Sequence, residues 1–179
     1  MSKPVIAILV IAVLSLVGIK VLIPEKEVVR IGQQHAIQDE GEKHLASTDE
    51  KHAPYVTDQP TSGPHFAQPA AWGVSEREIP DEQWIHNLEH GGVVITYKPD
   101  LPAKDIDELR VIAANLTMRD GQTSKKGFKV VLTPRAANKS AVQLSSWGYS
   151  ISLDAVDKTK IQQFYRDRPN TAPEPNAAG

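Results

Sequence analysis

Two histidines and a glutamate fall within five residues, in the segment His86-Asn87-Leu88-Glu89-His90. Imidazole nitrogens suit Zn and Cu ions, and two histidines four residues apart would share one face of a helix. A third histidine, His65, follows the turn-forming pair Gly63-Pro64 on another segment. Together, His65, His86 and His90 predict a transition-metal site built from two parts of the chain.

Further side chains could complete such a site. His44 is the fourth candidate ligand. Glu89 could orient a ligand histidine through a hydrogen bond, bind the ion itself, act as a general base, or be a solvated surface charge. His35 and His52 are more typical of histidines that make surface hydrogen bonds. A metal-free alternative is a polar network in which the imidazole nitrogens tie the loop to the sheet.

The elements that must position these residues begin with a segment rich in proline, residues 53–83, which disfavours both helix and central strand. Long irregular loops in compact domains are usually functional or disordered. Gly91-Gly92 follows the paired histidines directly, so we expect any helix there to last about one turn. The patterning then predicts, in order, a strand, a helix, two strands and a helix, at residues 93–97, 104–117, 128–133, 141–149 and 153–165.

This order predicts an α+β domain with a small sheet of about three to four strands. Two helices would pack on one face of the sheet, and the long proline-rich loop carrying His65 would precede it. The expected domain runs from residue 44 to 168, and a flexible tail spans residues 169–179.

The first 23 residues predict a membrane anchor. Residues 4–23 are apolar apart from Lys20, and about 20 such residues cross a bilayer core. No good cleavage site follows, so we expect an uncleaved signal anchor. Lys3 favours a cytoplasmic N-terminus, which would place the polar stalk, residues 24–43, and the domain outside the cytoplasm, in a bacterial periplasm or at the cell surface.

Composition excludes several classes of protein. The chain has no cysteine, which rules out disulfides, thiolate metal sites and cysteine nucleophiles. Its formal charge is −2, with 20 basic and 22 acidic residues and no basic cluster, so a nucleic-acid partner has no electrostatic support.

The segment from His86 to His90 also matches the H-x-x-E-H pattern of one class of zinc proteases, in which Glu89 would activate water. That pattern requires a sustained helix and a ligand from a later helix, and Gly91-Gly92 argues against the first requirement. An enzyme is therefore the alternative to a binding domain. A second alternative is an envelope interaction module in which the histidines are structural.

The chain also resembles a known family, the bacterial domain of unknown function 3105. The residues that carry the resemblance are Thr61-Ser62-Gly63-Pro64-His65, Trp72-Gly73, His86-Asn87-Leu88-Glu89-His90-Gly91, Trp147-Gly148 and Ala172-Pro173-Glu174. The resemblance implies a small exported domain behind one membrane segment. It also implies that His44, His65, His86 and His90 stand where members usually carry histidine. The chain departs from the usual pattern at Gln59-Pro60 and at Val74-Ser75.

The sequence thus predicts a membrane-anchored, extracytoplasmic domain that binds a metal ion through a histidine cluster. Copper is favoured over zinc because the ligands are imidazoles, thiolates are absent and the expected location is exported. The predicted role is sequestration or delivery of the ion rather than catalysis.

Overall fold

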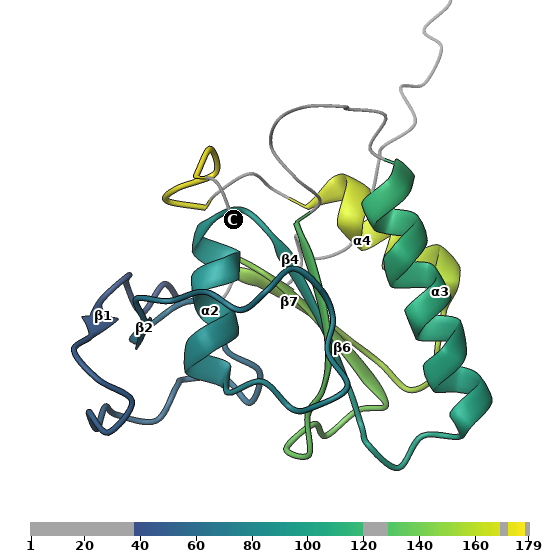
Figure 1. Cartoon of the computed structure of the whole chain (residues 1–179), viewed down its shortest axis with the longest axis horizontal. Helices are drawn as coiled ribbons and strands as arrows, with labels where there is room; N and C mark the ends of the chain where they lie inside the picture. The colour runs from purple at the N-terminus through teal and green to yellow at the C-terminus, as the bar shows by residue number, and fades with distance from the viewer. Residues whose placement is uncertain (1–37, 120–128, 169–171, 178–179) are drawn as a thin grey trace, which may run out of the picture.

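The structure, a computed structural model, describes residues 38–119, 129–168 and 172–177 (Figure 1). Its elements, in chain order, are β1 (His44–Leu45), β2 (His65–Phe66), β3 (Gly73–Val74), α2 (Asp81–Glu89), β4 (Val93–Tyr97), α3 (Ala103–Arg119), β5 (Val130–Pro134), β6 (Val142–Ser146), β7 (Tyr149–Leu153) and α4 (Lys158–Asp167). The predicted α+β class is confirmed.

The main sheet has five strands in the order β3-β5-β4-β6-β7, with β4 at its centre. β4 pairs in parallel with β5, and α3 connects the two; β6 and β7 are antiparallel. The sheet is larger than the three to four strands expected, for two reasons. β3 forms within the proline-rich segment, and the single strand expected at 141–149 is a hairpin, because Gly148 adopts a φ of 74° and lets the chain reverse.

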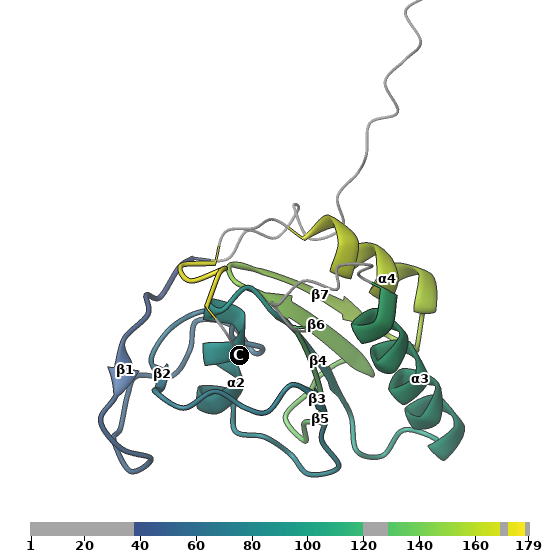
Figure 2. The same ribbon diagram turned by 45° about the horizontal axis from the view of Figure 1, so that its top comes forward.

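Two helices, α3 and α4, cover one face of this sheet, as Figures 1 and 2 both show. Alternate residues of β4, namely Val93, Ile95 and Tyr97, point to this side and join an apolar core with Leu109 of α3 and Phe164 of α4. The last helix begins later than expected. Residue 153 ends β7 and residue 156 precedes α4, whose N-terminus is capped by the carboxylate of residue 157.

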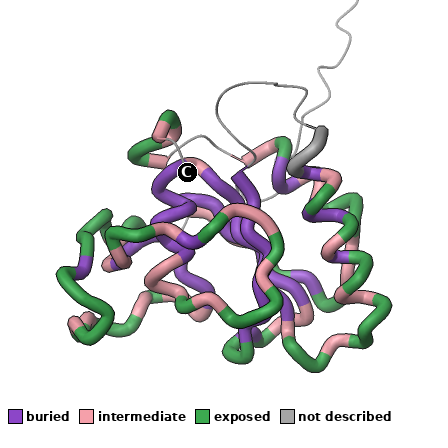
Figure 3. The backbone as a smooth tube through the Cα atoms, in the orientation of Figure 1, coloured by how far each residue is buried: buried purple, intermediate pink, exposed green. Residues whose placement is uncertain are grey.

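The opposite face is covered by α2 and by the loop that precedes it. Val94 and Val131 of the sheet meet Trp84, Ile85 and Leu88 of α2 in a smaller apolar cluster. Polar residues surround this cluster. The buried hydroxyl of Thr96, for example, donates a hydrogen bond to the Gln59 or Asn138 side-chain oxygen, each 3.0 Å away. Figure 3 shows the buried residues concentrated in the sheet and α2.

Helix α2 is nine residues long, so the expectation of about one turn was wrong. The acidic side chains of Asp81 and Glu82 in its first turn stabilise the helix, because they lie at the positive end of the helix dipole. The glycines lie after the helix. The Gly91 and Gly92 amides donate to the Leu88 and Asn87 carbonyls at 2.8 and 2.9 Å, and Gly91 has a φ of 79°, which together form a Schellman C-terminus. The glycines therefore end the helix without limiting its length.

The predicted membrane anchor and most of the predicted stalk lie outside the described residues. Within the ranges that the structure describes, no helix combines the length and the apolar character needed to span a bilayer. His35 also falls outside these ranges.

Candidate metal centre

Three chain segments bring their histidines and a glutamate together beside the main sheet. β1 and β2 run parallel, and their register pairs His44 with His65, so these two imidazoles lie next to each other. Helix α2 contributes His86 and, three residues later, Glu89, which share a helix face. The ligand atoms of these four residues all lie within 4.8 Å of one another.

The carboxylate of Glu89 is the common neighbour of the three imidazoles. Its Oε2 atom lies 3.4 Å from Nε2 of His44, 3.2 Å from Nε2 of His65 and 3.7 Å from Nε2 of His86. Ligands at about 2.0–2.1 Å from a tetrahedral zinc ion lie roughly 3.3–3.4 Å apart. The three distances to the Glu89 oxygen are therefore close to those between donors around a single ion, and all four atoms lie within 4.8 Å of one another.

Backbone carbonyls fix the orientation of two of the rings. Nδ1 of His65 lies 2.7 Å from the Gly63 carbonyl oxygen, and Nδ1 of His86 lies 2.8 Å from the Phe66 carbonyl oxygen. A carbonyl can only accept, so each Nδ1 carries the proton, and in the neutral ring the Nε2 lone pair is free. The His65 lone pair faces the Glu89 carboxylate oxygen at 3.2 Å, an arrangement that needs a proton or a cation between the two groups, and the His86 lone pair faces Nε2 of His90 at 3.0 Å. Metal-binding histidines usually have this type of outer hydrogen bond.

Three of the four candidate ligands are buried, and the fourth is exposed to solvent. The side chains of His65 and Glu89 are 0% and 3% exposed, whereas that of His44 is 48% exposed, so the centre meets solvent on the His44 side. Desolvation lowers the pKa of His65 below its ordinary value, which favours the neutral ring that binds metal.

Of the other described histidines, His90 lies beside this group and His52 lies apart from it. Nε2 of His90 lies 3.0 Å from Nε2 of His86, but His90 groups with Glu89 and Glu174 instead of with His44 and His65. His52 contacts the Glu82 carboxylate at 3.3 Å, away from the cluster. We name the set of His44, His65, His86 and Glu89 the histidine cluster. Its predicted role as a ligand set stays a prediction.

Comparison with known proteins adds a family. The sequence model of the family described as Protein of unknown function (DUF3105) matches residues 46–179, most of the chain. The chain belongs to this family. No curated protein and no solved structure matched. The DUF3105 match contains three members of the histidine cluster, and the fourth, His44, lies two residues before it begins.

In this DUF3105 chain, the buried side-chain amide of Asn87 connects α2 to the loop that follows β2. Asn87 of α2 is fully buried; its Nδ2 donates to the Ala70 carbonyl, and its Oδ1 accepts from the Ala70 amide, both at 2.9 Å. Asn87 thus fastens the loop between β2 and β3 to α2. The hydroxyl of Tyr55 also donates to the Pro64 carbonyl at 2.6 Å, beside His65.

The role of Asn87 was not predicted, because side-chain pairing with a distant backbone leaves no local sequence pattern. Glu174 was placed in the predicted flexible tail. Glu174 is tied to the site by its own amide, which donates to the Glu89 carbonyl at 3.0 Å. The only signal for Glu174 in the sequence was its place in the Ala172-Pro173-Glu174 segment that carries the family resemblance.

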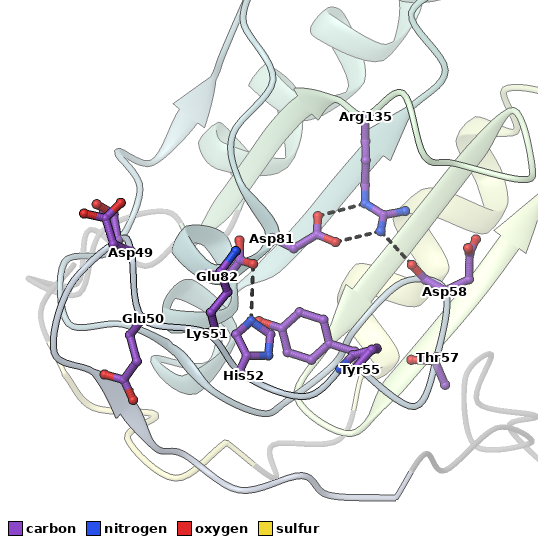
Figure 4. Close-up of a pocket in the computed structure, with 12 residues that line it drawn as sticks. Asp49, Glu50, Lys51, His52, Tyr55, Thr57, Asp58, Asp81, Glu82 and Arg135 are labelled. Atoms are coloured by element: carbon purple, nitrogen blue, oxygen red, sulfur yellow. Dashed lines mark hydrogen bonds and ion pairs between the residues drawn. The ribbon is translucent and has the colours of Figure 1, made fainter.

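A surface pocket of about 650 Å³ lies at the other end of α2 (Figure 4). The pocket is rich in carboxylates, and much of its polar surface is paired internally. Arg135 makes two hydrogen bonds to the Asp81 carboxylate, at 2.8 and 2.6 Å, and one to the Asp58 carbonyl at 2.6 Å. No member of the histidine cluster lines this pocket. The hydrogen bonds between Arg135 and Asp81 tie the start of α2 to the end of β5.

Proposed function

We propose that this chain is a membrane-anchored, extracytoplasmic domain that binds a transition-metal ion at the histidine cluster and sequesters or delivers that ion. One observation carries the proposal. Nε2 atoms from three histidines converge on one buried carboxylate oxygen, at separations of 3.2, 3.4 and 3.7 Å. Without a cation or an added proton, this arrangement would leave the Glu89 charge buried beside the His65 lone pair, which is unfavourable.

The number of donors favours binding over catalysis. Structural zinc sites are closed by four protein ligands, whereas catalytic sites have three and keep one position for water or substrate. Four protein donors complete a four-coordinate sphere. Glu89 is also the centre of the donor set, which leaves it unavailable as a general base. An enzyme of the H-x-x-E-H type would need a further ligand from a later helix, and Glu108, the one glutamate of α3, is exposed on the opposite side of the sheet.

Copper, as Cu²⁺, is the ion we favour, with zinc second. Imidazole suits both ions, and Cu²⁺ generally binds such sites more tightly than Zn²⁺. The chain has no cysteine and so offers no thiolate that would select Cu(I). An exported location, where copper handling is common, adds to this preference.

A metal titration of the full chain tests the proposal. The chain would be kept in mild detergent because of its apolar segment at residues 4–23, stripped of metal, and titrated with Cu²⁺ and Zn²⁺ by calorimetry. We expect stoichiometric binding, tighter for Cu²⁺. The His65→Ala variant should weaken binding by more than about 100-fold, beyond the roughly 10–100-fold typical of losing an indirect partner.

The matched control is His52→Ala, which removes an imidazole that lies outside the cluster. It should bind both ions like the wild type. Absence of stoichiometric Cu²⁺ and Zn²⁺ binding, or equal affinity in His65→Ala and wild type, would contradict the proposal.

The proposed location has its own test. Protease added to intact spheroplasts should digest the domain while a cytoplasmic marker survives. Protection of the domain until the membrane is lysed would place it on the cytoplasmic side and refute the anchor orientation.

A further inference from the structure

Beside the histidine cluster lies a second group of three metal-ligating side chains, Glu89, His90 and Glu174. One ligand atom from each lies within 4.8 Å of the others, and Nε2 of His90 is 3.5 Å from Oε2 of Glu174. Glu89 belongs to both groups. His90 and Glu89 are 7% and 3% exposed, whereas the Glu174 side chain is 59% exposed. The second group is thus buried at its base and open at Glu174.

Packing of the C-terminal segment, residues 172–177, brings Glu174 into this group. The backbone amide of Glu174 donates to the Glu89 carbonyl at 3.0 Å. Lys129 donates to the carbonyl oxygens of His90, Pro175 and residue 177, the last two at 3.0 Å. Figure 1 shows this segment, in yellow, beside the end of α2.

Close approach of the backbones reinforces this docking. A Cβ atom added at Gly91 would lie 3.3 Å from Cα of Pro175. Gly91 also has a positive φ, of 79°, so the position suits glycine on both grounds. The segment is therefore held by its backbone, which leaves the Glu174 side chain free to act as a ligand.

The chemistry of this group points to a divalent cation. Two carboxylates lie close to each other, and their mutual repulsion is relieved by a positive charge between them. The Lys129 ammonium lies beside this group and donates to the three carbonyl oxygens. Nδ1 of His90 is buried and has no hydrogen-bond partner among the described residues, so no carbonyl fixes this ring as it fixes His65 and His86.

We propose that Glu89, His90 and Glu174 form a second divalent-cation site next to the histidine cluster, and that the Glu89 carboxylate is shared by the two ions. The first site offers mainly nitrogen donors and the second mainly oxygen donors. Oxygen-rich donor sets suit Mn²⁺, and sets that add an imidazole suit Zn²⁺. We assign Zn²⁺ to the second site. The inference rests on the proposed function, because Glu89 also serves the first site.

Counting bound ions tests the second site. Native mass spectrometry of the metal-stripped full chain in detergent, titrated with Zn²⁺ alone, should show two ions binding in sequence. Glu174→Gln removes a carboxylate charge but leaves the backbone docking intact, so it should bind one ion with the affinity of the wild-type first site. Glu108→Gln, the same change on exposed α3, is the matched control and should bind two.

The His65→Ala variant separates the two proposals. If the wild type binds one ion, and His65→Ala loses it while Glu174→Gln does not, the second site is refuted and the proposed function stands. One ion that both variants lose means a single centre shared by all these ligands, which also refutes a second site. Two ions retained by Glu174→Gln would show that Glu174 is no ligand and overturn the assignment. No bound ion at all would refute the proposed function itself.

Discussion

On one face of the main sheet, α3 and α4 cover an apolar core; on the other, α2 and an irregular loop cover a mixture of apolar and polar residues. The same strand serves both. Val93, Ile95 and Tyr97 of β4 face the helices, and Val94 and Thr96 face the loop. The first face is held by burial of apolar surface, which has no directional requirement. The second combines a smaller apolar cluster with hydrogen bonds whose partners must be matched one by one.

This difference suits the two faces to different tasks. An apolar core stabilises the sheet whatever the details of its loops, so β4 and α2 can serve as a rigid platform. A metal site needs donors held within a few tenths of an ångström, and fixed hydrogen bonds such as those of His65 and Asn87 provide that. We therefore expect substitutions on the helical face to change stability alone, and those on the loop face to change stability and metal affinity together.

The largest expected effect is on the helical face. Phe164 of α4 is fully buried in the apolar core, and Phe164→Ala should lower the free energy of unfolding by about 3–5 kcal/mol. Chemical denaturation of the metal-free chain measures this loss. The folded variant should bind Cu²⁺ with wild-type affinity in a titration without denaturant. Weaker binding by the folded variant would mean that the two faces are coupled.

On the loop face, Asn87→Ala should lower the free energy of unfolding by about 2–3 kcal/mol, because it leaves the Ala70 amide and carbonyl buried without partners. It should also weaken metal binding roughly 10–100-fold, since the loop that follows His65 loses its tie to α2. Denaturation and calorimetry on one preparation give both numbers. The control Asn115→Ala removes a partly exposed amide from α3, whose hydrogen bond to the helix backbone is exposed, and should change stability by less than about 0.5 kcal/mol. Unchanged metal affinity in Asn87→Ala would break the comparison.

The two faces of the sheet also differ in how well the sequence predicts their elements. Elements of the helical face follow hydrophobic periodicity, so residues 93–97 were predicted as a strand with the bounds that β4 has, and α3 was placed within two residues at each end. The loop face follows no period. β3 is two residues within a proline-rich segment, and it forms only because β5 lies beside it. The histidines and Glu89 were identified by residue type, which the sequence states directly.

The grouping of the histidines could not be read from the sequence. His86 and His90 are four residues apart, which suggested ligands of one ion. Their Nε2 atoms do lie 3.0 Å apart, but the sequence did not show that His90, the C-cap residue of α2, also lies close to Glu174 of the C-terminal segment. The pairing of His44 with His65 depends on β1 and β2, two strands of two residues each, which carry too little pattern to predict.

Gly92→Ala tests whether the packing of the loop against α2 affects metal binding. An added Cβ would lie 2.5 Å from the Trp72 ring and 2.7 Å from the Asn87 carbonyl oxygen, so the loop must shift away from α2. We expect a loss of about 2 kcal/mol in the free energy of unfolding, together with weaker metal binding. Gly148→Ala is the control. It has a positive φ of 74°, but an added Cβ would meet nothing within 4 Å, so the substitution should cost about 1 kcal/mol without affecting metal binding. Equal metal affinities in the two variants would show that Trp72 packing does not reach the site.

The smallest effect is expected at the N-terminus of α4. The backbone amide of Lys160 donates to the Asp157 carboxylate at 3.0 Å and lowers the pKa of this exposed group below its ordinary value. The lowered pKa means that the carboxylate stabilises the fold above the ordinary value of about 3.9, and that this stabilisation is lost as the pH falls through the lower, folded value. Asp157→Ala should thus reduce the melting temperature slightly at pH 7, and the difference from wild type should shrink as the pH approaches 3. Thermal unfolding of the metal-free chain at both pH values measures this, and Cu²⁺ affinity at pH 7 should stay unchanged because α4 packs on the opposite face of the sheet. A difference that persists undiminished at pH 3 would show that Asp157 acts through packing rather than through its charge.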